Sequence, residues 1–143
     1  MYCKRFGNIC IICGKIQIMS KIIETTNAPA PIGPYSQAVL AGNTLYVSGQ
    51  IALNPESGEI ENESLEAETH RVMKNMLAVL KAADFSIDDV VKCSIFIMDM
   101  NDFGVINGVY GGYFHKTFPA RETVQVAGLP KAVRVEISCI AVK

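Results

Sequence analysis

Two charged residues lie in apolar, strand-like segments of the sequence, where an ion is costly to bury unless a partner or ligand compensates it. Arg121 begins one such segment, and its planar guanidinium could bind a carboxylate through two parallel hydrogen bonds. Glu136 stands between two apolar residues, where partial burial would raise its pKa and allow it to activate a water molecule. The ordinary alternatives are a surface ion pair of Arg121 with Glu122 or Glu136, and a solvent-facing position for Glu136.

A second group of candidates lies between residues 33 and 50. Tyr35 follows a Gly-Pro pair in a proline-rich stretch that we expect to be a loop of fixed shape, so its hydroxyl could be directed at a ligand. A tyrosine packed within its own loop is the commoner case. Ser48 and Gly49 come at the end of a predicted strand and offer a hydroxyl and a backbone N–H to an anion. Each of these signals is weak when taken alone.

The sequence has no pattern typical of a metal, nucleotide or serine-nucleophile site. It contains no glycine-rich phosphate loop and no Gly-x-Ser-x-Gly motif, and His70 and His115 are its only histidines. The net charge of −1 argues against a nucleic-acid-binding protein, and no apolar run reaches the length of about 18–20 residues that a membrane-spanning helix needs. We therefore expect a single soluble domain, and neither a zinc enzyme nor one that uses a histidine base.

The first 18 residues differ in composition from the rest of the chain. They contain three of the five cysteines and three basic residues but no acidic residue, which leaves a net charge of −4 for residues 19–143. A weak targeting peptide, a thiol or metal motif at Cys10 and Cys13, and translation from a start codon upstream of Met19 would each explain such a segment. We favour the third, and expect residues 1–18 to be a disordered or non-native extension of a domain that spans residues 19–143.

The cysteine content also bears on the cellular compartment. An odd number of cysteines without the spacing of a disulfide framework is typical of a reducing environment, where thiols act as small buried hydrophobic groups. We expect a cytoplasmic protein unless residues 1–18 direct it to an organelle.

The hydrophobic pattern predicts an α+β domain. Apolar residues recur at steps of three and four over residues 64–83, and again from Asn101 or Asp102 to the stop at Pro119, which predicts two helices. The four glycines of the second helix indicate either close packing or fraying of its last turns. Segments typical of strands are residues 22–26, 38–41, 44–48, 90–98, 122–127 and 133–142. This order implies a sheet with both helices on one face, and the uncovered apolar face implies self-association.

Several of the candidate residues belong to five separated motifs. These are Gly33-Pro34-Tyr35-Ser36-Gln37-Ala38, Ser48-Gly49-Gln50-Ile51, Asn101-Asp102-Phe103 with Asn107, Phe118-Pro119-Ala120-Arg121, and Leu129-Pro130-Lys131 with Val135-Glu136-Ile137. In this order, and over about residues 20–143, they closely resemble the RidA (YjgF/YER057c) family of enamine and imine deaminases, historically called endoribonuclease L-PSP.

The resemblance implies a fold, an assembly and an activity. The fold would be a chorismate-mutase-like (bacillus type) sheet with two helices on one face, and the assembly a homotrimer around a central barrel with clefts at the subunit interfaces. The activity would be that of a 2-iminobutanoate/2-iminopropanoate deaminase. Such an enzyme hydrolyses reactive enamines or imines such as 2-aminoacrylate to 2-keto acids and ammonia without a cofactor.

The resemblance also implies roles for individual residues. Arg121 would hold the substrate carboxylate and Glu136 would position the attacking water. Tyr35 would be a third catalytic residue that lines the pocket, and Ser48, Gly49, Asn107 and Thr123 would bind the substrate, the last through its backbone N–H. Two departures from the family pattern stand out, because Thr123 replaces a cysteine and Ser138 replaces the second glutamate of a Glu-x-Glu pair.

Two other functions are compatible with such a chain. A ribonuclease or translation inhibitor, as the older family name suggests, would need acid-base groups at a basic site, whereas residues 19–143 carry a net charge of −4 and two histidines outside any motif. A non-enzymatic ligand-binding or chaperone-like trimer would use Arg121 but would not need Glu136.

Overall fold

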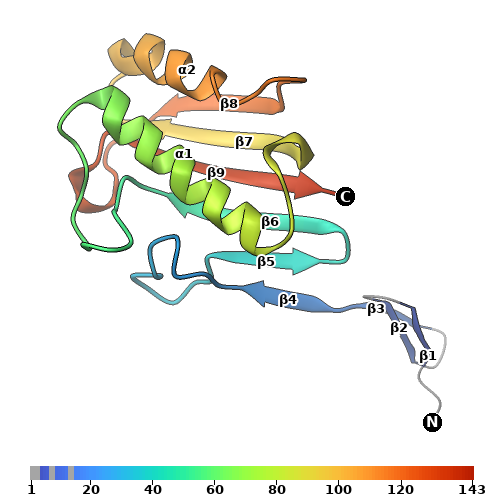
Figure 1. The fold of residues 1–143 in the computed structure, drawn as a ribbon. Coiled ribbons are helices and arrows are strands. Elements are labelled where there is room, and N and C mark those ends of the chain that lie inside the picture. Colours follow the sequence, from blue (N-terminus) through green and yellow to red (C-terminus); the bar gives the residue numbers. More distant parts are fainter. Residues whose placement is uncertain (1–3, 7–8, 13–14) are drawn as a thin grey trace.

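The main element of the computed structural model, which describes residues 4–6, 9–12 and 15–143, is an open six-stranded sheet (Figure 1). Its strands are β4 (Ser20–Ile23), β5 (Ala38–Ala41), β6 (Thr44–Gln50), β7 (Val90–Ile97), β8 (Ala120–Gln125) and β9 (Val135–Val142). They lie in the order β4-β5-β6-β9-β7-β8, in which β7 and β8 are parallel and all other neighbours antiparallel. Strands β4 and β8 therefore form the two edges of this sheet.

Two helices, α1 (Leu65–Ala82) and α2 (Phe103–Gly111), cover one face of this sheet (Figure 1). Helix α1 begins where the sequence predicts, because the Ser64 hydroxyl accepts a hydrogen bond from the Ala67 N–H at 3.0 Å. The predicted α+β class, and the placement of both helices on one face, are confirmed.

Helix α2 is shorter than predicted, since it ends at Gly111 and not near Pro119. A Cβ added at Gly104, Gly108 or Gly111 would meet no other part of the described chain within 4 Å, so packing inside one chain does not require these glycines. Each costs about 1 kcal/mol relative to alanine in a helix, and the helix stops where a further glycine follows. The apolar periodicity continues past this point because Phe114 still packs on the core of the domain.

Five of the six predicted strands have shifted ends. Strand β6 runs on to Gln50 and β7 stops at Ile97, and three others shift as follows. The strand predicted over residues 122–127 begins at Ala120, where parallel pairing with β7 starts opposite Lys92. The last strand begins at Val135 and not at residue 133, because a short 3-10 turn, Pro130–Ala132, precedes it. The strand predicted over residues 22–26 is β4, which ends before Thr25.

Buried Gln37 explains why β4 ends early and why the following loop has a fixed shape. Its side-chain oxygen accepts a hydrogen bond from the Thr25 N–H at 2.7 Å. Its side-chain NH2 group donates to the carbonyls of Thr25, Ala28 and Pro29 at 3.0, 3.1 and 2.8 Å, so that one of its two N–H bonds is shared between two carbonyls. Each of these backbone groups would otherwise need another partner, so one side chain holds the loop that leads to Tyr35.

The two faces of the sheet differ in burial. Alternate residues of β9 (Val135, Ile137, Cys139 and Ala141) are buried toward the helices, as the alternation predicts. Cys93 is buried opposite Cys139, and both are free thiols. On the other face Ile22, Tyr46 and Val124 are exposed. An uncovered, partly apolar sheet face is thus confirmed for the single chain.

An ion pair between Glu68 and Arg134 anchors the loop before β9. The fully buried Glu68 carboxylate accepts hydrogen bonds from the backbone N–H and Nε of Arg134, both at 2.6 Å. The sequence suggests only that Glu68 favours the first turn of α1. The contact lies next to Lys131 and Ala132, whose φ angles of 56° and 54° are unfavourable for residues with a Cβ. Glu68 therefore holds a strained turn in place.

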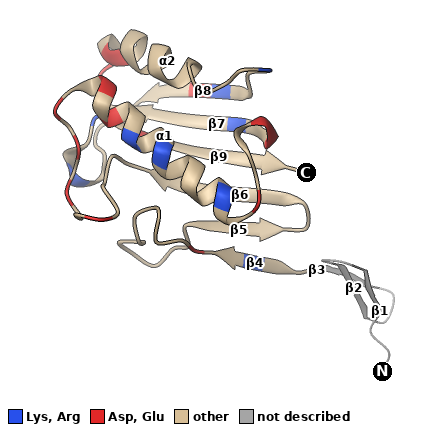
Figure 2. Ribbon diagram, in the orientation of Figure 1, with Lys and Arg blue, Asp and Glu red and all other residues tan. Residues whose placement is uncertain are grey.

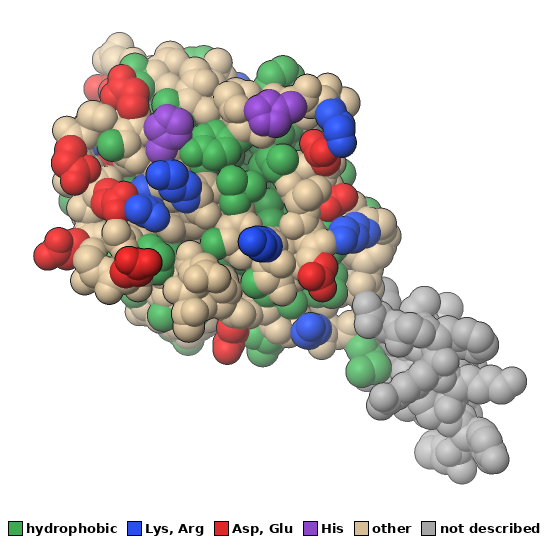
Figure 3. Space-filling view, in the orientation of Figure 1, with side chains coloured by type: hydrophobic (Ala, Val, Ile, Leu, Met, Phe, Trp, Pro, Cys, Tyr) green, Lys and Arg blue, Asp and Glu red, His purple; other side chains and the backbone are tan. Residues whose placement is uncertain are grey.

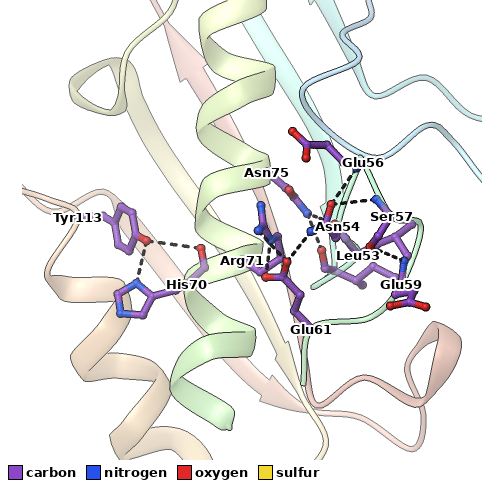
Figure 4. Close-up of polar contacts among 11 residues, drawn as sticks. Leu53, Asn54, Glu56, Ser57, Glu59, Glu61, His70, Arg71, Asn75 and Tyr113 are labelled. Atoms are coloured by element: carbon purple, nitrogen blue, oxygen red, sulfur yellow. Dashed lines mark hydrogen bonds and ion pairs between the residues drawn. The ribbon is translucent and has the colours of Figure 1, made fainter. Parts of the chain in front are cut away.

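Further polar contacts fix the segment between β6 and α1 (Figure 4). Buried Asn75 donates to the carbonyls of Ile51 and Leu53 at 2.9 and 2.8 Å. Arg71 donates two hydrogen bonds of 2.7 Å to Glu61, and this contact lowers the pKa of the Glu61 carboxyl. Two side chains of α1, Asn75 and Arg71, thus bind the segment that follows β6.

The N-terminal segment contains three short strands, β1 (Lys4–Phe6), β2 (Ile9–Ile12) and β3 (Lys15–Ile18), which pair as a separate antiparallel sheet. Cys13 lies outside the described residues, so the suggested Cys10 and Cys13 motif does too. The boundary of the domain at residue 19 stays a prediction.

Two absences concern the described part of the chain. No helix in it is long and apolar enough to cross a membrane. No three of its histidine, cysteine, aspartate or glutamate side chains are grouped as metal ligands.

Replacing Glu68 with alanine should lower the free energy of unfolding by about 2–4 kcal/mol, because it removes two hydrogen bonds and leaves a backbone N–H and a guanidinium without their partner. Chemical denaturation of the folded protein measures this loss. Glu66→Ala, an exposed neighbour in the same helical turn, is the matched control and should change stability by less than about 0.5 kcal/mol. Equal losses in the two variants would show that the ion pair contributes little.

Candidate functional site

Glu136 lies on the uncovered face of the sheet, beside Phe96 of the neighbouring strand. Its side chain is half-buried, and no hydrogen bond or ion pair within the described residues involves its carboxylate. Burial therefore raises the pKa of the Glu136 carboxyl above that of an ordinary glutamate. A carboxylate in this state is a good acceptor for a water proton.

Gly49 allows the Glu136 carboxylate to lie directly against strand β6. A Cβ added at Gly49 would overlap Glu136 Oε1 and lie 2.7 Å from its Cδ. The pairing of β6 with β9 is also irregular here, since the register shifts between Val47 and Gln50. A glycine in a bulged part of the strand thus makes room for the carboxylate.

A pocket of about 570 Å³ brings together four of the residues selected from the sequence, Tyr35, Ser48, Gly49 and Glu136. Ile32 and Pro130 complete its apolar wall, and Ser138 lies beside Glu136. The pocket therefore contains one carboxylate, where the family's Glu-x-Glu pattern would supply two.

Two of the three hydroxyl groups of this pocket, those of Ser48 and Tyr35, already have partners. The Ser48 hydroxyl donates to the Ser36 carbonyl at 2.7 Å, and Tyr35 accepts a hydrogen bond from the Ile32 N–H at 3.4 Å. Ser48 is therefore held by the loop that Gln37 organises. It can still accept a hydrogen bond from a ligand, whereas its proton is in use.

Arg121 lies in a second pocket, of about 400 Å³, with Asn107, Tyr110, Phe118 and Pro119. Its Nη1 donates to Asn107 Oδ1 at 2.8 Å. Neither ion pair suggested by the sequence forms, because Glu122 instead contacts Lys92 and Ser94 and Glu136 lies elsewhere. Within the described residues Arg121 has no carboxylate partner, and most of its guanidinium donors face the pocket and solvent.

Thr123 lies on the same side of β8 as Arg121. Its hydroxyl oxygen is buried and has no hydrogen-bond partner among the described residues. The hydroxyl group at the position of the family's cysteine is thus shielded from solvent.

One chain does not bring Arg121 and Glu136 together. In the sheet Arg121 pairs with Cys93, which is buried on the helix-covered side, whereas Glu136 pairs with Phe96 on the opposite side. Residues paired across neighbouring strands share a face, and successive residues alternate between faces. The two pockets therefore open on opposite faces of one sheet.

Three further residues near these pockets are not indicated as functional by the sequence. Phe103 and Tyr110 flank the Arg121 guanidinium, with ring centroids 5.7 and 5.1 Å from its Cζ. Their spacing with Asn107 at three and four residues is a detectable signal, but it equally fits the core face of a helix. Gln37 occurs in a motif, yet nothing in the sequence indicates its four hydrogen bonds.

Comparison with known proteins gives a consistent result. The family model described as Endoribonuclease L-PSP matches residues 25–143. A RutC family protein of Pyrococcus horikoshii is 48% identical over 87% of this chain and 99% of its own length. The 2-iminobutanoate/2-iminopropanoate deaminase of Mus musculus is 48% identical over 88% of this chain and 93% of its own.

A solved structure confirms the fold. The crystal structure of Escherichia coli TdcF with bound serine is 44% identical and covers 86% of this chain and 98% of its own, with a TM-score of 0.83. The resemblance that the five motifs indicate is thus confirmed over both sequence and fold, and the chain belongs to the Endoribonuclease L-PSP, or RidA/YjgF, family.

Proposed function

We propose that the protein hydrolyses small 2-imino or enamino acids, such as 2-aminoacrylate, to 2-keto acids and ammonia. The observation that carries the proposal is an arginine held by Asn107 in a pocket without a carboxylate partner, on a chain that also presents a half-buried, unpaired glutamate. The deaminase name of the mouse relative supports the reaction type. The serine bound to Escherichia coli TdcF is likewise a small molecule with a carboxylate.

Arg121 would bind the substrate carboxylate with the donors that Asn107 leaves free. Two parallel hydrogen bonds from a guanidinium fix both the position and the plane of a carboxylate. Because the imine carbon is bonded directly to that carboxylate, fixing the carboxylate also fixes the reacting atom. An imine carbon is already electrophilic, so orientation contributes a large part of what the reaction needs.

Glu136 would hold and activate the attacking water. The water oxygen bonds to the imine carbon while its proton passes by way of Glu136 to the imine nitrogen. The hydroxyl proton of the resulting carbinolamine then passes, again by way of Glu136, to its amino group. The C–N bond breaks as the C=O bond forms, which releases ammonia and leaves the keto acid. No oxidant, metal or cofactor takes part in these steps.

A second copy of the chain would complete the site. The two pockets lie on opposite faces of one sheet, and the face that carries Glu136 is uncovered and partly apolar. Packing that face against a neighbouring copy, in a homotrimer, would cover the apolar side chains and bring Arg121 of one copy to Glu136 of the next. This arrangement accounts for the separation of the two groups in one chain.

RNA cleavage is less well supported as a second candidate, despite the family's description. Basic positions follow one another along α1, but acidic ones lie at the start of this helix and on the neighbouring loops, so both signs occur together on the face drawn (Figures 2 and 3). His70 Nδ1 is 2.8 Å from the Tyr113 hydroxyl, so this histidine is engaged within the fold. A binding protein without activity would need Arg121 and not Glu136, and the variants below distinguish it.

Replacing Arg121 with alanine or lysine should lower kcat/KM for enzymatically generated 2-aminoacrylate by about 30- to 1,000-fold, because a two-point charged contact is lost. Lysine keeps the charge but not the planar pair of donors. Keto-acid release measures the rate, and light scattering checks that the assembly is unchanged. Activity within about twofold of the parent would contradict the carboxylate role of Arg121.

Gly49→Ala should lower kcat/KM by about 10- to 100-fold, because the added methyl group displaces the Glu136 carboxylate from its position against β6. Stability should change little, since the group displaced is the end of a flexible side chain. Gly128→Ala is the matched control, as a Cβ there meets nothing within 4 Å. If both alanine variants keep full activity, the position of Glu136 is not critical.

Mixed trimers test whether the site is shared between chains. Arg121→Ala and Glu136→Gln chains should each retain only a small residual activity alone, but a mixed trimer would contain one interface with both native residues. Random mixing of co-produced chains should then restore about a quarter of the parent activity. Light scattering of the parent should give three times the chain mass of 15.6 kDa. No recovery of activity in verified mixed trimers would place the site elsewhere.

The rate should depend on the ionisation of Glu136. Because burial raises the pKa of this carboxyl, it takes up a proton at a higher pH than an exposed glutamate, and the protonated form cannot accept a proton from water. We expect kcat/KM to fall with decreasing pH from a point above about 4.3, the usual glutamate value. The residual activity of Glu136→Gln should not show this fall in kcat/KM at low pH. The same fall in that variant would mean that another group causes the pH dependence.

A further inference from the structure

The guanidinium of Arg121 is more constrained than its exposure suggests. Arg121 is an exposed residue, and an exposed arginine ordinarily samples many rotamers, which must be given up when it binds a ligand. Here Nη1 is held at 2.8 Å by Asn107 Oδ1. One hydrogen bond fixes a point of the group but leaves its plane free to turn.

Two aromatic rings supply the missing constraint. The Arg121 Cζ lies 5.1 Å from the centroid of the Tyr110 ring and 5.7 Å from that of Phe103, both within the range of cation–π attraction. Phe103, Asn107 and Tyr110 are spaced by four and three residues on α2, so they form one face of that helix. The guanidinium thus contacts two rings and one amide oxygen of a single helical face.

The helical face is itself held in register with β8, the strand that carries Arg121. Gln125, four residues after Arg121 on the same side of β8, accepts a hydrogen bond from the Met100 N–H at 3.0 Å. Tyr110 is buried, and its ring packs on Phe114 with centroids 4.8 Å apart. The hydrogen bond thus ties the turn that leads into α2 to β8, and the buried Tyr110 fixes the helix on the core.

We propose that Phe103 and Tyr110 are positioning residues that hold the Arg121 guanidinium in one plane, with its remaining N–H donors presented to a small, planar carboxylate. The inference rests on the proposed function for the identity of the ligand, but not for the rigidity of the arginine. The rings act through Arg121 and need not touch the substrate. If the guanidinium is already held in one plane, the Arg121 side chain loses less conformational entropy when a ligand binds.

The motion of Arg121 itself gives a test that does not depend on turnover. In the ¹⁵N-labelled full chain, restricted rotation of the guanidinium should give separate Nη signals for Arg121, assigned with Arg121→Lys. Tyr110→Leu and Phe103→Leu should merge these signals. Tyr110→Phe and Phe103→Tyr keep the ring faces and should preserve them. The buried Tyr110 hydroxyl has no hydrogen-bond partner among the described residues, so Tyr110→Phe loses little.

Pyruvate, a small 2-keto acid, serves as the probe for carboxylate binding. Its affinity should fall about 3- to 30-fold in each leucine variant and stay within about twofold in each aromatic variant. Val105→Ala, an exposed position on another side of α2, is the matched control and should change neither readout.

The proposal is overturned if Arg121 is as mobile in the parent as in the leucine variants, or if leucine and aromatic variants behave alike. A parent chain with a rigid Arg121 and no deaminase activity would instead refute the proposed function and leave the positioning role intact.

Discussion

Side chains alternate between the two faces of a β-sheet, and in this protein that alternation separates Arg121 from Glu136. The parallel pairing of β7 with β8 places Arg121 on the helix-covered side, and the antiparallel pairing of β7 with β9 places Glu136 on the open side. A shift of either register by one residue would exchange the faces and bury a charge in the core. The positions of these two candidate residues are therefore specified by the same pairing that forms the core.

Each half of the site is held by contacts that a stable fold alone would not require. Glu136 lies against a glycine in an irregular part of β6, unpaired and partly desolvated, which raises its pKa. Arg121 lies between two aromatic rings and an amide, without a carboxylate partner among the described residues. Unpaired charges of this kind are unfavourable in a single chain, and a bound substrate or a neighbouring copy would compensate them.

Buried polar side chains hold the loops around the first pocket. Gln37 fixes the loop before Tyr35, Asn75 fixes the backbone at Ile51, and Glu68 fixes the turn that contains Pro130. Each satisfies backbone groups that would otherwise be buried without partners. The loops can thus line a pocket of defined shape although they contain no regular secondary structure.

The sequence alone determined the fold class, the start of α1, the buried alternation of β9 and the five motifs that identify the family, because these depend on local periodicity and residue type. It also singled out Arg121 and Glu136, since charges in apolar strands are rare. The end of α2 was predicted too far along the chain because buried Phe114 continues the apolar period beyond the helix.

Tertiary structure alone decided which residues contact one another. The close approach of Glu136 to Gly49, the ring faces beside Arg121 and the partners of Gln37 and Glu68 join segments that are distant in sequence. Such contacts depend on strand order and register, which a periodic pattern does not specify. For the same reason only the assembled sheet reveals that its two catalytic candidates lie on opposite faces.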